Sequence, residues 1–236
     1  MRLDKKLANS GYGTRSEIKT WISKGQVAVN GTITKDSGLQ ISDNDEITIN
    51  GNSISTTEHL YFVFDKPDCV ATAMEDKRLE CVGDYIPKNL KGKHLSPVGR
   101  LDYHTTGLLI ITNDGDLNHR LTSPKYKIPK TYRVEYEGEL FGQDLIEDLA
   151  KGITLTDMDK PVKLAPATAV LPEDHVLLLT LTEGKTHEVR RIVSHYGRTV
   201  KTLRRISIGS FAPEDLAPGD LRELTDDEIR SIQAMF

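Results

Sequence analysis

The chain has 236 residues, of which 37% are hydrophobic and 28% charged, and its formal net charge is −4 at pH 7. This length predicts one small and one larger domain, and no apolar run approaches the roughly 20 residues that a membrane span needs. The polar N-terminus does not resemble a secretory signal, and two cysteines, Cys69 and Cys81, are too few for a disulfide framework or a zinc quartet. We therefore expect a cytoplasmic protein with no membrane role.

Two short helices are predicted at the start of the chain. Leu3 and Leu7 are four residues apart, which is the spacing of one helical face. Thr14 and Glu17 have the spacing of a capping box, and apolar residues then recur at helical intervals until Gly25 offers a stop.

Small strands and tight turns are predicted to follow these helices. Two Asn-Gly pairs, at residues 30–31 and 50–51, each follow a short strand-like run, and Asn-Gly favours hairpin turns. We therefore expect a first domain over residues 1–51, a polar linker over residues 52–58 and a second domain over residues 59–236.

The second domain is predicted to contain more strands than helices. Helical patterns occur at residues 144–150 and 188–195. The strand-like runs cover residues 60–64, 108–112, 131–136 and 176–181. Because strands and helices do not alternate regularly, the sequence predicts an α+β fold with a mixed, largely antiparallel sheet.

Positive charge is concentrated in two segments. Residues 1–25 hold six bases against two acids, and residues 184–205 hold seven bases against Glu188 alone. Because Lys and Arg neutralise phosphates, two basic faces on an acidic body suit an RNA clamp, although each could also be an ordinary solvated helix face. The candidate RNA contacts of the first segment are Arg2, Lys5, Lys6, Arg15, Lys19 and Lys24.

An aspartate in a loop before a buried strand is the strongest candidate for chemistry. Residues 99–102 read Gly-Arg-Leu-Asp, and residues 105–115 continue as Thr-Thr-Gly-Leu-Leu-Ile-Ile-Thr-Asn-Asp-Gly. This pattern resembles the RsuA family of pseudouridine synthases, in which the aspartate is the nucleophile. Without that resemblance, Asp102 would be interpreted as a turn residue that bonds its own backbone.

Further segments resemble the same family in the same order. They are Asp-Lys-Pro at residues 65–67, Lys-Thr-Tyr-Arg-Val at 130–134, Glu-Gly-Lys-Thr-His-Glu-Val-Arg-Arg at 183–191 and Leu-Arg-Arg-Ile-Ser-Ile-Gly at 203–209. The first fifty residues resemble the S4 RNA-binding module that the family carries. The resemblance therefore spans nearly the whole chain.

The resemblance implies three catalytic residues. Asp102 would attack the uridine, and Arg190 would form an ion pair that keeps Asp102 deprotonated. Tyr132 would stack on the pyrimidine and help to remove the C5 proton. Taken alone, Tyr132 would be a core residue and Arg190 a surface charge. The implied substrate contacts are Arg100, Leu203, Lys66, Lys185, His187 and Arg191.

Three positions depart from the family pattern. Asp65 stands for Asn, Glu188 for Gln, and Cys69 for a Gly. The last change places a side chain in a loop where glycine would permit positive φ, which cysteine tolerates poorly.

The resemblance also indicates a substrate. Residues 151–166 look most like the member that makes pseudouridine at position 516 of 16S rRNA, and 23S rRNA or another structured RNA is the alternative. A non-catalytic S4-type RNA-binding or ribosome-assembly factor is the alternative of a different class. Isomerising uridine changes neither oxidation state nor atom count, so we expect no cofactor and no metal. We also expect the protein to be a monomer whose partner is RNA.

Overall fold

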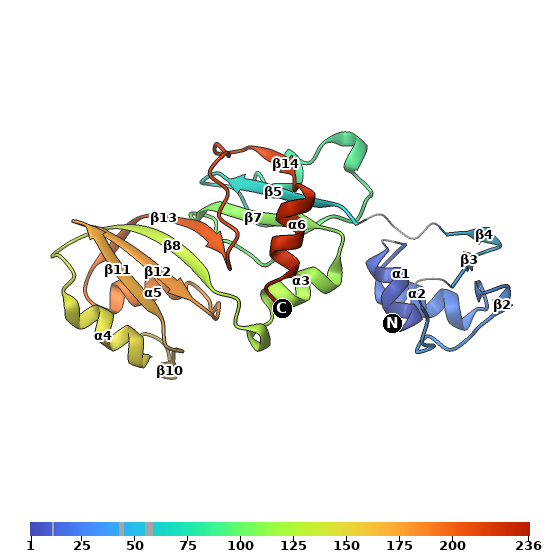
Figure 1. The fold of residues 1–236 in the computed structure, drawn as a ribbon, viewed down its shortest axis with the longest axis horizontal. Coiled ribbons are helices and arrows are strands. Elements are labelled where there is room, and N and C mark those ends of the chain that lie inside the picture. Colours follow the sequence, from blue (N-terminus) through green and yellow to red (C-terminus); the bar gives the residue numbers. More distant parts are fainter. Residues whose placement is uncertain (11, 43–44, 55–58) are drawn as a thin grey trace.

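The structure is a computed structural model that describes residues 1–10, 12–42, 45–54 and 59–236 (Figure 1). The first 54 residues form a small helix and sheet unit at one end of the molecule. Its elements are α1 (Leu3–Asn9), α2 (Arg15–Ser23), β1 (Val27–Val29), β2 (Thr32–Ile33), β3 (Ile47–Ile49) and β4 (Asn52–Ser53). The strands form a sheet in the order β2-β1-β3-β4, and both helices pack fully buried apolar side chains against it.

The local signals of this unit act as the sequence predicts. Thr14 N donates to Glu17 Oε2 at 2.8 Å and Glu17 N donates to Thr14 Oγ1 at 3.3 Å, so the capping box that opens α2 is confirmed. Asn30 and Asn50 have φ of 50° and 51°, as tight Asn-Gly hairpin turns require.

The expected linker is corrected at its start. Because the turn after β3 folds the chain back, Asn52 and Ser53 pair with β3 as strand β4 and are not linker. Residues 55–58 of the expected linker lie outside the described residues.

Most of the remaining strands form one large sheet in the order β11-β12-β8-β13-β7-β5-β14, with β6 paired to β7. They are β5 (Tyr61–Lys66), β6 (Ser96–Pro97), β7 (Thr106–Thr112), β8 (Lys130–Glu137), β11 (Thr168–Glu173), β12 (Val176–Leu181), β13 (Thr199–Ile208) and β14 (Leu221–Glu223). A two-stranded ribbon consists of β9 (Thr154–Leu155) and β10 (Val162–Lys163). The predicted mixed, largely antiparallel sheet is confirmed.

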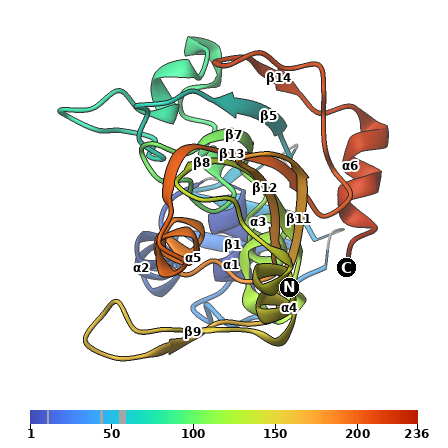
Figure 2. The same ribbon diagram turned by 90° about the vertical axis from the view of Figure 1, so that its left-hand side faces the viewer.

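Helices cover the sheet at several places. They are α3 (Gly115–Thr122), α4 (Gln143–Lys151), α5 (Glu188–His195) and α6 (Asp226–Gln233), with 3-10 turns η1 (Val82–Tyr85), η2 (Lys88–Leu90) and η3 (Pro124–Tyr126). Figures 1 and 2 show α4 and α5 against the same face of the sheet. Within the described ranges, none of the helices has the length and apolar character that crossing a membrane would require.

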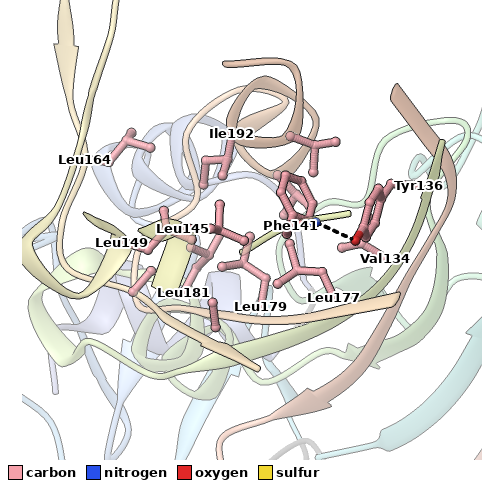
Figure 3. Packing of buried hydrophobic residues seen from close by; sticks show 14 of the residues in the cluster. Val134, Tyr136, Phe141, Leu145, Leu149, Leu164, Leu177, Leu179, Leu181 and Ile192 are labelled. Carbon is pink, nitrogen blue, oxygen red and sulfur yellow. Dashed lines mark hydrogen bonds between the residues drawn. The ribbon is translucent and has the colours of Figure 1, made fainter. Parts of the chain in front are cut away.

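The core of the β8, β12 and β13 half is packed beneath α4 and α5. Leu145 and Leu149 of α4 and Ile192 of α5 meet the inward-facing leucines of β12 (Figure 3). The hydroxyl of Tyr136 accepts a hydrogen bond from Phe141 N at 3.1 Å, which ties the end of β8 to the segment that enters α4. This packing holds α5 in place beside the strands.

Strand β13 joins the two halves of the sheet. It pairs antiparallel with β8 and parallel with β7, where Arg204 and Arg205 lie opposite Thr106 and Gly107. A Cβ at residue 107 would lie 2.3 Å from the Arg205 carbonyl oxygen, so only glycine allows this close approach. The start of β7 and the middle of β8 are thus brought to opposite sides of one short stretch of β13.

Candidate active site

A cavity of about 450 Å³ opens where β7 begins. One wall is the loop between β6 and β7, residues 98–105, called here the Asp102 loop. The other walls come from β8, from β13 and from the segment that joins β12 to α5. Its lining residues are Arg100, Leu101, Asp102, Thr105, Tyr132, Leu181, Glu183, Gly184, Lys185, Thr186, His187, Glu188, Val189 and Leu203.

Side chains from the end of β5 and from the loop after it hold the backbone of the Asp102 loop in place. Thr72 Oγ1 donates to the Leu101 carbonyl at 2.6 Å and accepts from Leu101 N at 3.2 Å. Lys66 Nζ donates to the Tyr103 carbonyl at 3.2 Å. These bonds flank Asp102 on both sides, so its side chain projects from a held backbone and remains 39% exposed.

Lys66 lies beneath the cavity and does not line it. The residue is fully buried, and its ammonium also donates to the carbonyls of Pro67 and Val70 at 3.0 and 2.7 Å. Burial lowers the pKa of Lys66 to about 8, although the nearby acidic groups partly oppose this shift. The protons of Lys66, which was predicted to contact substrate, instead bond to backbone carbonyls of the loops in this structure.

Arg190 lies beside the Asp102 loop but does not pair with Asp102. Its Nη2 donates to the His104 carbonyl at 2.7 Å. The side chain that approaches Asp102 is the imidazole of His187, whose Nε2 lies 3.7 Å from Asp102 Oδ1. The predicted Arg190–Asp102 ion pair is thus corrected: the guanidinium is used to hold the backbone two residues after the aspartate.

The other sequence-predicted contacts divide into two groups. Asp102, Tyr132, Arg100, Leu203, Lys185 and His187 all line the cavity. Arg191 does not, because its guanidinium makes two 2.7 Å hydrogen bonds to Asp157.

The predicted contacts of the first basic segment are partly engaged in ion pairs. Arg2 and Arg15 both approach the buried carboxylate of Asp4, at 3.0 and 3.5 Å, and Lys5 pairs with Asp116. The hydrogen bond from Arg2 holds the pKa of Asp4 below its ordinary value, even though burial acts in the opposite direction. The two arginines remain about half exposed, so their outer faces are still accessible to phosphate.

Sequence reasoning missed two residues that shape the site. Thr72 holds the Asp102 loop, and Glu183 lines the cavity and accepts from Lys185 and from Ala165 N at 2.7 Å each. A threonine 29 positions before the backbone that it bonds leaves no signal in one sequence, whereas Glu183 opens the predicted 183–191 motif and could have been named.

Glu188 is a buried carboxyl in the wall of the cavity. Its Oε2 accepts from Lys185 N at 2.7 Å, while Oε1 is buried without a hydrogen-bond donor. Burial, together with the neighbouring Glu183 carboxylate, raises the pKa of Glu188 to about 7, against the opposing effect of the Lys185 N–H. Although burial acts to raise the pKa of Glu183, its hydrogen bonds from Lys185 and Ala165 N keep that pKa below its ordinary value.

The free energy of unfolding of the wild type should fall as the pH rises, because Glu188 must then ionise while buried. We expect Glu188→Gln to lack this fall. In the unfolded chain Glu188 ionises near 4.5, but in the folded chain only near 7. Between these two pKa values the folded state binds more protons than the unfolded state, so stability falls as the pH rises through this window and the loss is complete above pH 7.

Thermal melting at pH 5 and pH 8 tests this predicted loss of stability. The melting temperature of wild type should drop more than that of Glu188→Gln, while the exposed-site control Glu147→Gln should follow wild type. Equal drops in all three proteins would contradict the buried carboxyl.

Within the described residues, no group of three metal-ligating side chains lies in the cavity lining. The cavity instead combines three carboxyl groups, a phenol, one arginine, one lysine and one histidine side chain, and an apolar wall. A carboxylate beside an aromatic ring and cationic groups can hold a planar base and act on it as a nucleophile.

Comparison with known proteins gives a consistent result. Residues 60–195 match the family described as RNA pseudouridylate synthase, and residues 1–47 match the S4 domain. An uncharacterized RNA pseudouridine synthase of Bacillus subtilis is 39% identical, over 97% of each chain. The ribosomal large subunit pseudouridine synthase B of the same organism is 34% identical over 99% of this chain and 96% of the relative.

Two further similarities cover the full length. The ribosomal small subunit pseudouridine synthase A of Vibrio vulnificus is 35% identical over 98% of this chain and 99% of the relative. A crystal structure of a pseudouridylate synthase is 33% identical and superposes with a TM-score of 0.70 over 98% of this chain and 99% of that one. The chain therefore belongs to the RNA pseudouridylate synthase family and carries an S4 domain at its N-terminus.

Proposed function

We propose that the protein isomerises a specific uridine of ribosomal RNA to pseudouridine, with Asp102 as nucleophile. The observation that carries this proposal is the shared cavity: Asp102 and Tyr132, from segments 30 residues apart, line one space of about 450 Å³. That space suits a single nucleotide taken out of its stack.

The cavity residues supply the steps of the reaction. The C1′–N1 bond of uridine breaks, the base rotates, C1′ bonds to C5, the C5 proton leaves and N1 gains a proton. The Asp102 carboxylate attacks C1′ or C6, while the Tyr132 ring supports the pyrimidine and its hydroxyl relays the C5 proton, releasing its own proton to water as it takes up the new one. Leu203, which is 4% exposed, forms an apolar wall that keeps water from the base.

Arg190 and His187 support the nucleophile in different ways. Arg190 fixes the Asp102 loop through the His104 carbonyl, and so acts as a positioning residue. His187 is the N-cap residue of α5, with φ of 50°, and its ring nitrogen Nε2 lies 3.7 Å from Asp102 Oδ1. Arg100 and Lys185 also line the cavity, where cationic groups can bind the phosphates that flank the target base.

Release of tritium from RNA labelled at C5 of uridine tests the activity. Release on incubation with the purified protein supports the proposal, because the C5 proton leaves only when the new C–C bond forms. No release over hours, with RNA binding retained, favours the non-catalytic RNA-binding or assembly factor.

The target is proposed to be position 516 of 16S rRNA, on the resemblance of residues 151–166 to the enzyme of that site. The similarity to a small-subunit synthase of Vibrio vulnificus supports this, and the similarity to a large-subunit synthase of Bacillus subtilis supports 23S rRNA as the second candidate. Mapping pseudouridine in rRNA from cells with and without the gene separates the two, because one modified position should disappear from either 16S or 23S rRNA.

We expect deletion of residues 1–55 to weaken RNA binding more than chemistry. The deleted part has its own buried core and carries seven bases, so its loss should raise KM by at least about tenfold on a long rRNA fragment. The value of kcat on saturating RNA should change little. Steady-state kinetics at two salt concentrations measure both, with a smaller salt dependence expected for the truncated protein. An equal loss of kcat and of affinity would mean that the S4 domain shapes the active site.

A further inference from the structure

A cluster of three chemically different ligand side chains lies outside the cavity, on the far side of the Asp102 loop. Asp68, Cys69 and His104 place one ligand atom each within 4.8 Å of one another. Nδ1 of His104 lies 3.1 Å from Asp68 Oδ1 and 3.8 Å from Cys69 Sγ. Among the residues that the structure describes, this is the one group of three or more His, Cys, Asp or Glu side chains whose potential ligand atoms lie within 4.8 Å of one another.

The sheet brings these residues together from distant parts of the sequence. Strands β5 and β7 are antiparallel neighbours, and Lys66 at the end of β5 lies opposite Gly107 at the start of β7. The loop after β5 and the loop before β7 therefore meet at one edge of the sheet. Asp68 and Cys69 come from the first loop, and His104 comes from the Asp102 loop.

The backbone around the cluster is held by side chains that lie outside it. Lys66 donates to carbonyls of both loops, Thr72 bonds Leu101 in both directions, and Arg190 bonds the His104 carbonyl. Cys69 has φ of 58°, so the cysteine adopts the left-handed conformation for which a glycine would be the usual choice. Its thiol is thereby exposed beside the imidazole.

We propose that Asp68, Cys69 and His104 form a zinc-binding site on the Asp102 loop, with water completing the coordination. A tetrahedral zinc ion with bonds of roughly 2.0–2.3 Å places its ligand atoms about 3.3–3.8 Å apart, which is close to the distances of this cluster. One thiolate and one carboxylate balance the charge of Zn²⁺. On binding, the Cys69 S–H bond breaks, an S–Zn bond forms and the proton passes to the buffer.

The ligand types select the metal. Thiolate and imidazole favour zinc, whereas Mg²⁺ and Ca²⁺ prefer oxygen ligands. The expectation of no zinc rested on too few cysteines for a quartet, and a mixed site needs only one. His104 and Asp68 are more than half exposed, so the site is open to solvent and can exchange its metal.

A bound zinc ion would connect the loop after β5 to the Asp102 loop, the same two loops that the ammonium of Lys66 joins through backbone carbonyls. It would thus restrain the backbone two residues after Asp102. The proposal does not depend on the identity of the RNA or on turnover, since binding is measured with the metal alone.

Zinc titration of the full-length, chelator-treated protein by calorimetry tests the site. We expect one zinc ion per chain in the wild type and no heat with MgCl₂. Loss of a residue that merely orients a ligand costs roughly 10- to 100-fold in metal affinity, so Cys69→Ser and His104→Gln should each weaken binding by at least about tenfold. His119→Gln, which removes an exposed histidine on α3, is the matched control and should bind as wild type does.

Cobalt provides a second readout specific to sulfur. Addition of CoCl₂ to the wild type should produce a thiolate-to-cobalt absorption band, which Cys69→Ser should lack. Circular dichroism melting of each variant checks that the fold is retained. Absence of zinc binding by the wild type, or equal affinity in wild type, Cys69→Ser and His119→Gln, would overturn the proposal.

Discussion

We expect Asp102→Asn to abolish pseudouridine formation while RNA binding persists. The amide keeps the size of the side chain and cannot attack carbon, and loss of a nucleophile costs on the order of 10⁴-fold or more in kcat. Affinity should change by less than about threefold, because it arises mainly from lysine and arginine contacts to phosphates. Tritium release and filter binding on the same RNA measure the two quantities.

Two control variants test whether deamidation of the new asparagine, or the loss of any one acidic charge, could account for the result. Asp102→Ala should be equally inactive and cannot revert to aspartate by deamidation, which could otherwise give Asp102→Asn a small false rate. Asp174→Asn changes an exposed acid outside the cavity and should keep full activity. Turnover by Asp102→Ala near the wild-type rate would remove Asp102 from the mechanism.

We expect Tyr132→Phe to lower kcat strongly and to leave KM nearly unchanged. The phenylalanine ring still supports the pyrimidine, but the hydroxyl that would take the C5 proton is lost, and general-base catalysis of this kind contributes roughly 10²- to 10⁴-fold. Single-turnover kinetics on saturating RNA isolate the chemical step from RNA binding.

A second substitution separates the two proposed roles of Tyr132. Tyr132→Ala should lose stacking as well, which contributes about 1–3 kcal/mol per base, so its affinity for RNA should fall in addition to its rate. Tyr126→Phe, outside the cavity, should behave as wild type. If Tyr132→Phe kept the wild-type kcat, the hydroxyl would not be the proton acceptor and only stacking would remain.

Local signals predicted much of the fold. The capping box of α2, the two Asn-Gly turns and the apolar runs of β5, β7 and β12 each depend on a few neighbouring residues, and the structure contains them. Strand β13 was not predicted as a strand, because its ten residues include three bases and lack a clean alternation. Its place is set by pairing with β7 and β8, which is information that no local pattern contains.

The candidate site likewise divides into features that local motifs predict and features that depend on long-range placement of the backbone. Motif resemblance identified Asp102, Tyr132 and Leu203, which line one cavity, because each lies in a recognisable segment. It did not predict that Arg190 bonds a carbonyl or that Lys66 is buried beneath the loop. Those outcomes depend on a few ångströms of backbone placement.

The position of β13 has a consequence for biosynthesis. The strand that sets Asp102 beside Tyr132 spans residues 199–208, long after both have been translated. While residues 1–198 emerge from the ribosome, the proposed catalytic side chains lack the strand that aligns them. The proposed active site therefore forms only near the completion of synthesis.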